Sequence, residues 1–118
     1  MTSYEIEIDH SDLASRQAAA ELRAKIESHV QNGGHVAISF ERVFSISESY
    51  ADELFGVLVL RHGLDWLVEN IGLEHINPTS FKAIASAIHQ RLSLSAPDSP
   101  NIALLAARKA LKQRRSHV

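Results

Sequence analysis

The sequence predicts an α/β domain with a mostly parallel sheet and helices packed on it. Three segments have strand patterns, at residues 4–9, 35–40 and 71–76, and amphipathic helical patterns separate them. Strands that alternate with helices need crossover connections, which make neighbouring strands parallel. The expected order of elements is therefore β-α-β-α-β-α-α.

Length and composition are those of one globular domain. The chain has 118 residues, of which 45% are hydrophobic and 22% charged, which is typical of folded proteins rather than disordered ones. It has no cysteine, so disulfides, thiolate metal sites, iron–sulfur clusters and cysteine nucleophiles are excluded. Its longest apolar run covers residues 54–60, whereas a membrane-spanning helix needs about 20 residues. No signal peptide is visible, so we expect a cytoplasmic protein.

The charge is divided unevenly along the chain. Residues 1–75 carry −8 and residues 76–118 carry +6, within a net charge of −2. The basic side chains near the C-terminus are Arg108, Lys109, Lys112, Arg114 and Arg115. This cluster predicts either contacts with phosphates of a nucleic acid or docking of the tail on the acidic body of the same chain. Cations are also favoured at a helix C-terminus by the helix dipole.

The first elements follow from local patterns. Residues 4–9 alternate apolar and polar side chains, as in a strand with one buried face. A cap within residues 10–12 is expected to start a helix over residues 13–30, with an apolar stripe made of Ala19, Leu22, Ile26, His29 and Val30. Residues 32–34, Asn-Gly-Gly, end this helix. Residues 35–40 are apolar enough to form the central strand.

The apolar pattern resumes at residues 43–46 and leads into a second helix. Ser49 with Asp52 matches the Ser-x-x-acid signal for a helix start, and Ser47 is an alternative cap. Residues 54–60 are apolar on nearly all sides. This part of the helix is therefore expected to be buried.

Glycine and proline mark the expected boundaries of the elements in the rest of the chain. Gly63 stops the second helix, and residues 64–70 fit either its continuation or a short extra turn. Residues 71–76 have the pattern of a strand. Residues 77–80, Asn-Pro-Thr-Ser, begin a helix that ends near residue 92, with one face made of Phe81, Ile84, Ala85, Ile88 and Leu92.

A linker over residues 93–100 contains two prolines. Asn101 is expected to cap a last helix that ends near Arg115, with apolar residues Ile102, Leu104, Leu105 and Leu111. We accordingly divide the chain into a domain at residues 1–94 and a linker with a basic C-terminal helix at residues 95–118.

Catalytic and metal-binding motifs are missing. The sequence has no Gly-rich phosphate loop, no G-x-S-x-G elbow and no H-E-x-x-H. Folding could gather His35, His62 and His75 into a metal site, but we expect ordinary histidines. Asp52 and Glu53 are expected to be helix-surface acids, because adjacent helical residues point about 100° apart. We therefore predict no enzymatic activity, no metal and no cofactor.

Three serines at residues 45, 47 and 49 cross from a strand into a helix N-terminus. The free N–H groups and the dipole at such an end favour anions. A serine there is either a cap or a phosphorylation site whose phosphate would sit at the positive end of the helix. The candidate residues for partner binding or phosphorylation are Ser45, Ser47, Glu48, Ser49 and Asp52.

Residues 36–56, VAISFERVFSISESYADELFG, resemble the core of the bacterial STAS-like domain family of unknown function. That core has an apolar strand, the pattern Asp-Phe-x-x-Val, a serine cluster, and Phe-Ala-Asp-Glu before an apolar helix. Here Ser39 stands in the place of the aspartate before Phe40. Residues 76–78 and the helix after them are similar to the second half of the family. The resemblance covers roughly residues 4–92 and implies a small STAS-like βα sandwich, with the C-terminal helix as an extra element.

STAS domains include antagonists of anti-sigma factors. In these, a partner kinase of the histidine-kinase-like ATPase fold phosphorylates a serine at a helix N-terminus, and phosphorylation breaks the complex. The resemblance implies a binding module that is switched by charge. Residues 47–50 lie where the antagonists have Asp-Ser-Ser-Gly. Glu48 then occupies the phosphoacceptor position and mimics the phosphorylated form or abolishes the switch; with the pairing shifted by one, Ser47 or Ser49 is the candidate.

The leading hypothesis is a non-enzymatic regulatory domain that binds an ATPase, a kinase or an anti-sigma-type protein at this helix start. One alternative is a nucleic-acid-binding accessory protein that uses the basic C-terminal helix. Another is a small-molecule site at the carboxyl edge of the sheet, near Ser47, Ser49 and Asn77. A homodimer through Leu104 and Leu111 is a further alternative.

Overall fold

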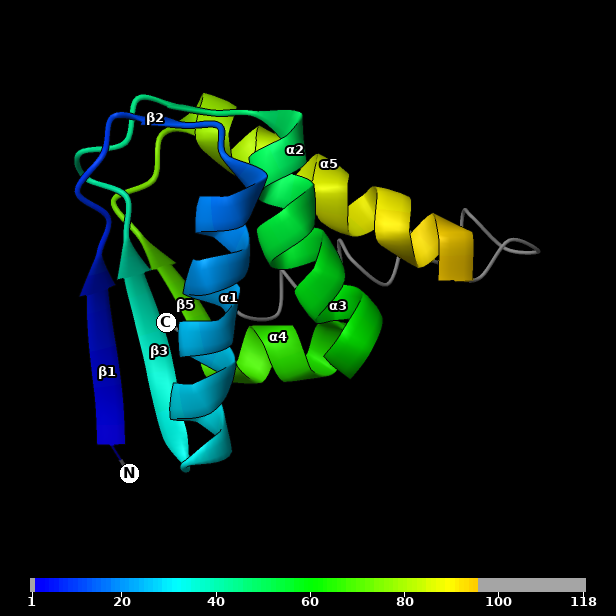
Figure 1. Ribbon diagram of the computed structural model, residues 1–118. Helices are drawn as coiled ribbons and strands as arrows, with labels where there is room; N and C mark the ends of the chain where they lie inside the picture. Colours follow the sequence, from blue (N-terminus) through cyan, green and yellow to red (C-terminus); the bar gives the residue numbers. More distant parts are fainter. Residues whose placement is uncertain (1, 96–118) are drawn as a thin grey trace.

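A three-stranded parallel sheet forms the framework of the domain (Figure 1). The computed structural model describes the backbone of residues 2–95 and the side chains of residues 3–93. Strands β1 (Thr2–Glu7), β3 (Gly34–Ser39) and β5 (Ile71–Glu74) lie in the order β1-β3-β5, with both pairings parallel. The α/β class and the central position of the second strand are confirmed. The last strand stops at Glu74, two residues before the predicted end.

The segment before the first helix folds differently from the prediction. Helix α1 (Arg16–Gln31) starts three residues later than expected, and its cap is Ser15, whose Oγ accepts a hydrogen bond from the Ala18 N–H at 3.2 Å. The predicted cap within residues 10–12 is wrong. Asp12–Leu13 instead forms strand β2, which pairs in parallel with β4 (Ser45–Ile46) in a separate two-stranded sheet. This pairing buries Leu13 in the core.

The connection from β3 to β5 is a continuous helical run followed by a separate short helix. The run consists of α2 (Glu48–Ala51), a π-helical stretch η1 (Asp52–Gly56) and α3 (Val57–His62). Gly63, with φ +93°, stops it as predicted, and α4 (Leu64–Asn70) follows as the short extra element. Residues 54–60 of the run are buried as predicted, except for Val57, which is partly exposed, and Leu60, which is 49% exposed.

Helix α5 (Pro78–Ser95) packs against α2, η1 and α3 and extends away from the sheet (Figure 1). It runs three residues beyond the predicted end, so the predicted linker begins inside the helix. Ile84 and Ile88 are buried as expected, whereas Phe81 is 39% exposed because it lies in the first turn, at the rim of the helix layer. The predicted C-terminal helix lies outside the described residues. Within residues 2–95, no helix is both long and apolar enough to span a membrane.

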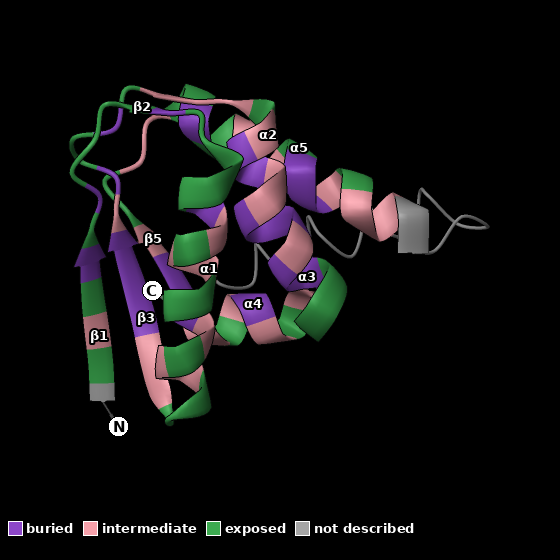
Figure 2. Ribbon diagram, viewed as in Figure 1, coloured by how far each residue is buried: buried purple, intermediate pink, exposed green. Residues whose placement is uncertain are grey.

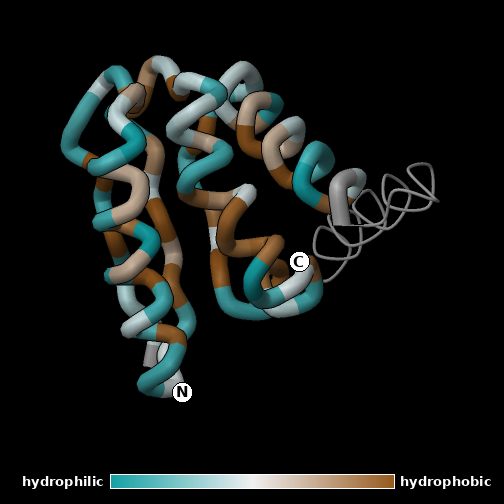
Figure 3. Tube along the Cα trace, turned by 45° about the vertical axis from the view of Figure 1, so that its right-hand side comes forward, coloured by the Kyte–Doolittle hydropathy of each residue, from teal (hydrophilic) through white to brown (hydrophobic). Residues whose placement is uncertain are grey.

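The sheet has two faces with different environments. On the inner face, residues from all three strands join one core cluster with the helices: Tyr4, Ile6, Val36, Ile38, Ile71 and Leu73. The alternation of exposed and buried residues is visible along β1 in Figure 2. In Figure 3, hydrophobic residues follow the strands and the buried helices, while α1 is largely hydrophilic. The alternate residues form what we call the outer sheet face: Ser3, Glu5, Glu7, His35, Ala37, Ser39, Gly72 and Glu74.

Candidate functional site

The predicted serines meet at the junction between β4 and α2. The Ser47 N–H donates to the Leu13 carbonyl at 2.8 Å, which ties the helix start to β2. Ser47 is the cap, because its Oγ accepts from the Tyr50 N–H at 3.1 Å. Of the two caps predicted, Ser47 is therefore correct and Ser49 is not. Ser49 is the second residue of α2, and its Oγ lies 3.2 Å from that of Ser47.

Ser45 lies one step further from the helix and makes a different contact. Its hydroxyl donates to Asp12 Oδ1 at 2.6 Å, across the β2–β4 pair. Ser45 is thus held by the small sheet, whereas Ser47 and Ser49 belong to the first turn of α2. The structure brings these three serines and Glu48 together, and it places Asp52 one turn further along the helix.

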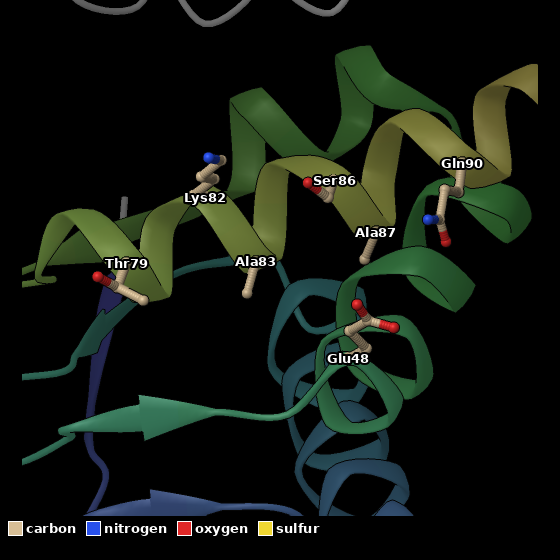
Figure 4. Close-up of a pocket in the computed structure, with 7 residues that line it drawn as sticks. All are labelled: Glu48, Thr79, Lys82, Ala83, Ser86, Ala87 and Gln90. Carbon is tan, nitrogen blue, oxygen red and sulfur yellow. The ribbon is translucent and has the colours of Figure 1, made fainter.

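Glu48 is exposed and borders a hollow of about 220 Å³ between α2 and α5. The hollow is lined on the α5 side by Thr79, Lys82, Ala83, Ser86, Ala87 and Gln90. Figure 4 shows Glu48 pointing toward α5, where Ala83 and Ala87 leave room, while Lys82 points away from it. No cation within residues 2–95 forms an ion pair with Glu48. The carboxylate therefore sets a negative charge at the very start of the helix.

Phe44 is the residue at this junction that the sequence did not single out. Its side chain is 73% exposed, yet its backbone is held at both ends. The Phe44 N–H donates to the Ser11 carbonyl at 2.7 Å, and its own carbonyl accepts from Asn77 Nδ2 at 3.2 Å. Strand alternation is the signal that could have found it, because burial of Val43 turns the next side chain outward.

Asn77 connects this loop with the start of α5. Its Oδ1 accepts from the Ser80 N–H at 2.7 Å as a helix cap, and its carbonyl accepts from the Phe81 N–H. Asn77 therefore forms hydrogen bonds with the backbones of both Phe44 and the partly exposed Phe81. We call Phe44, Ser47, Glu48, Ser49 and Phe81 the helix-start surface. The side chain of Asn77 is fully engaged in the fold, which weakens its case as a small-molecule ligand.

Asp52 and Glu53 form ion pairs whose shortest contacts go to different helices, although Arg16 of α1 also lies 3.9 Å from Asp52 Oδ2. Both carboxylate oxygens of Asp52 accept from Arg91 of α5, at 2.7 and 2.8 Å. Glu53 pairs with Arg23 of α1 at 2.8 Å and with Arg16 at 3.3 Å. Together they tie η1 to α5 on one side and to α1 on the other. No signal in the sequence pointed to these long-range partners.

These ion pairs give stability a defined pH dependence. The hydrogen bond from Arg91 lowers the pKa of Asp52 below 3.8, and that from Arg23 lowers the pKa of Glu53 below 4.5, although burial opposes both. Groups with a depressed folded pKa stabilise fully above the unfolded pKa and lose that contribution as the pH falls through the folded pKa. We expect the free energy of unfolding to decline below about pH 4.5. Asp52→Asn should cost about 1–2 kcal/mol at pH 7 and less at pH 3, as the pH falls toward the folded pKa, measured by urea unfolding. An equal cost at both pH values would contradict this assignment.

The three candidate histidines, His35, His62 and His75, are not gathered into one place. His62 Nε2 lies 2.7 Å from Glu27 Oε2, and its ring stacks on Trp66. His35 is near the amino end of β3, whereas His75 follows the carboxyl end of β5, so they lie at opposite ends of a parallel sheet. In the described part of the chain, no group of three or more His, Asp or Glu residues could hold a metal ion.

The basic candidates Arg108, Lys109, Lys112, Arg114 and Arg115 lie outside the described residues.

A model of the family described as a STAS-like domain of unknown function (DUF4325) matches residues 18–81, more than half of the chain. The chain belongs to this family. The matched range of the STAS-like domain runs from α1 to the first turn of α5 and contains the whole helix-start surface. No curated protein and no solved structure matches the chain significantly. The family predicted from residues 36–56 is thereby confirmed.

Proposed function

We propose that this STAS-like domain is a non-enzymatic regulatory module that binds a protein partner through the helix-start surface. The observation that carries the proposal is Phe44, three residues before the cap Ser47, which has a largely exposed side chain on a backbone that is held by hydrogen bonds. Binding hot spots are enriched in aromatic residues, and an anchor whose backbone is already held loses less entropy on binding than one on a free loop. The STAS-like character of the family suggests a histidine-kinase-like ATPase or an anti-sigma-type protein as the partner.

The same surface provides a means of control by charge. A phosphate on Ser47 or Ser49 would add about −1.5 to −2 charges at pH 7, next to the carboxylate of Glu48. The helix N-terminus would tolerate this charge, whereas a partner packed over Phe44 would have to desolvate it. Coupling of about 1–3 kcal/mol between modification and binding follows from such local electrostatics.

The test separates the role of Ser47 as a helix cap from the effect of a negative charge at the same position. Ser47→Asn keeps a good N-cap without a modifiable hydroxyl, whereas Ser47→Asp keeps the cap and adds charge. These two variants, the double variant Ser47→Ala/Ser49→Ala and the exposed control Ser28→Ala would each be used to capture partners from the native cell extract. Mass spectrometry identifies the partner and any phosphate on Ser47 or Ser49, and calorimetry with the purified partner gives the affinity.

We expect Ser47→Asn and Ser28→Ala to bind like the wild type and Ser47→Asp to bind at least tenfold more weakly, a difference of about 1.4 kcal/mol. If every variant binds the same partner equally, the binding face lies elsewhere. If only nucleic acid is captured and it washes off with salt, the basic C-terminal segment becomes the leading site.

A further inference from the structure

The hollow between α2 and α5 lies beside the helix-start surface and is open to solvent along one wall. On the α5 side its lining runs from Thr79 to Gln90, both exposed, a rise of about 16 Å along the helix. The side chains of Ala83 and Ala87 point from α5 toward the opposite wall (Figure 4). They form an apolar floor, of which Ala87 is buried.

Glu48 supplies the negative charge of this hollow. Its carboxylate is exposed and is directed from α2 toward α5 (Figure 4). Among the residues that the structure describes, no cation pairs with it, and Lys82 of the same lining points away from it (Figure 4). By contrast, Asp52 and Glu53 in the next turn are both paired with arginines. The described fold thus leaves the Glu48 carboxylate open to a cation from a bound protein.

An apolar floor next to a carboxylate fits a long side chain with an aliphatic stem and a cationic end. Lysine and arginine both bury their stems along apolar surface while the charged end stays near water. Arginine fits better, because its planar guanidinium can donate to both oxygens of one carboxylate. The hollow has a volume of about 220 Å³, whereas one water needs only about 10–15 Å³. It therefore has room for such a side chain.

We propose that this hollow receives an arginine of the protein partner and that Glu48 pairs with its guanidinium. The inference rests on the proposed function and specifies the chemistry of the partner. Thr79, at one end of the hollow, follows closely after Asn77, which holds the Phe44 carbonyl. An extended segment of about five residues spans the length of the hollow, so one partner can contact both Phe44 and Glu48.

This pairing is compatible with control by charge at the neighbouring serines. One guanidinium neutralises one carboxylate. A phosphate on Ser47 or Ser49 would lie beneath the same partner without a cation of its own, and burial of an unpaired charge is costly. The native charge of Glu48 therefore favours binding, whereas an added charge opposes it.

The test uses the full chain, with random peptides displayed on phage as the probe. Selections on the wild type and on Glu48→Gln are compared, because this substitution keeps the size of the side chain and removes its charge. We expect the wild type to enrich peptides with an arginine at one fixed position and Glu48→Gln to lose that preference. In calorimetry, the enriched peptide should bind Glu48→Gln at least about tenfold more weakly. Ala83→Leu, which fills the hollow, should have a similar effect, and urea unfolding shows that both variants are folded.

Two charge controls accompany Glu48→Gln. Glu5→Gln makes the same change on the outer sheet face, and Lys82→Ala removes the cation of the lining. Both should bind the arginine peptide no more weakly than the wild type does. The proposal is overturned if no peptide is enriched, if the preference for arginine persists on Glu48→Gln, or if Glu5→Gln loses as much affinity. Enrichment of acidic peptides that depend on Lys82 would overturn it as well.

The partner captured from cell extract separates this inference from the proposed function. A partner that needs Phe44 but binds Glu48→Gln like the wild type would support the helix-start surface and overturn the arginine site. An arginine peptide that needs Glu48, with no captured protein that needs Phe44, would support the arginine site and count against the proposed function.

Discussion

Phe44→Ala is expected to weaken partner binding by about 2–4 kcal/mol, or roughly 30-fold or more. The free energy of unfolding should stay within about 0.5 kcal/mol of the wild type, because the side chain is largely exposed and buries little on folding. Its backbone hydrogen bonds to Ser11 and Asn77 do not depend on the ring. Calorimetry with the captured partner measures the first effect, and urea unfolding measures the second.

Leu60→Ala is the matched control. Leu60 is 49% exposed, but it lies in α3, away from the helix-start surface. The Leu60→Ala variant should bind the partner as the wild type does. Equal losses of affinity in the two variants would point to unspecific hydrophobic capture and would count against the helix-start surface.

Gly56→Ala is expected to lower the free energy of unfolding by about 1–3 kcal/mol. In an ordinary helix the same change would stabilise by up to about 1 kcal/mol. Here an added Cβ would lie 2.5 Å from Asp52 Oδ1 and 3.0 Å from Arg91 Cγ. Asp52 cannot simply swing away, because Arg91 holds it with two hydrogen bonds. Urea unfolding of the full chain measures the change.

The cause can be isolated by repeating the substitution in an Asp52→Ala background. With the carboxylate removed, Gly56→Ala should become nearly neutral or slightly stabilising, since the closest contact is gone and helix propensity remains. An unchanged cost in this background would show that the Asp52–Arg91 pair is not the reason. The cycle thus reports how tightly η1 is clamped to α5.

The elements that the sequence predicted well are those whose signals are local. The alternation along residues 4–9 and the apolar run at 35–40 predict strands because successive side chains in a strand point to opposite faces. Gly63 predicts a stop, and the structure shows it at φ +93°. Residues 77–80 start α5 as their proline and asparagine suggest.

Errors arose where several local signals compete. Ser11, Asp12 and Ser15 are all capable N-caps, and local chemistry alone does not choose among them. The choice is made by β4, some 30 residues later, which pairs with Asp12–Leu13 and leaves Ser15 to cap α1.

The features of the candidate site likewise fall into those that adjacent residues determine and those that depend on tertiary contacts. The sequence by itself determined the family, the serine cluster and the cap Ser47, because these depend on residues adjacent along the chain. Only the tertiary structure decided that Phe44 has an exposed side chain on a hydrogen-bonded backbone, and that Asp52 is held by Arg91. Each of these results from contacts between residues more than 30 positions apart, or from packing of whole elements. Such contacts leave no periodic signature in the sequence, because their free energy depends on the assembled core.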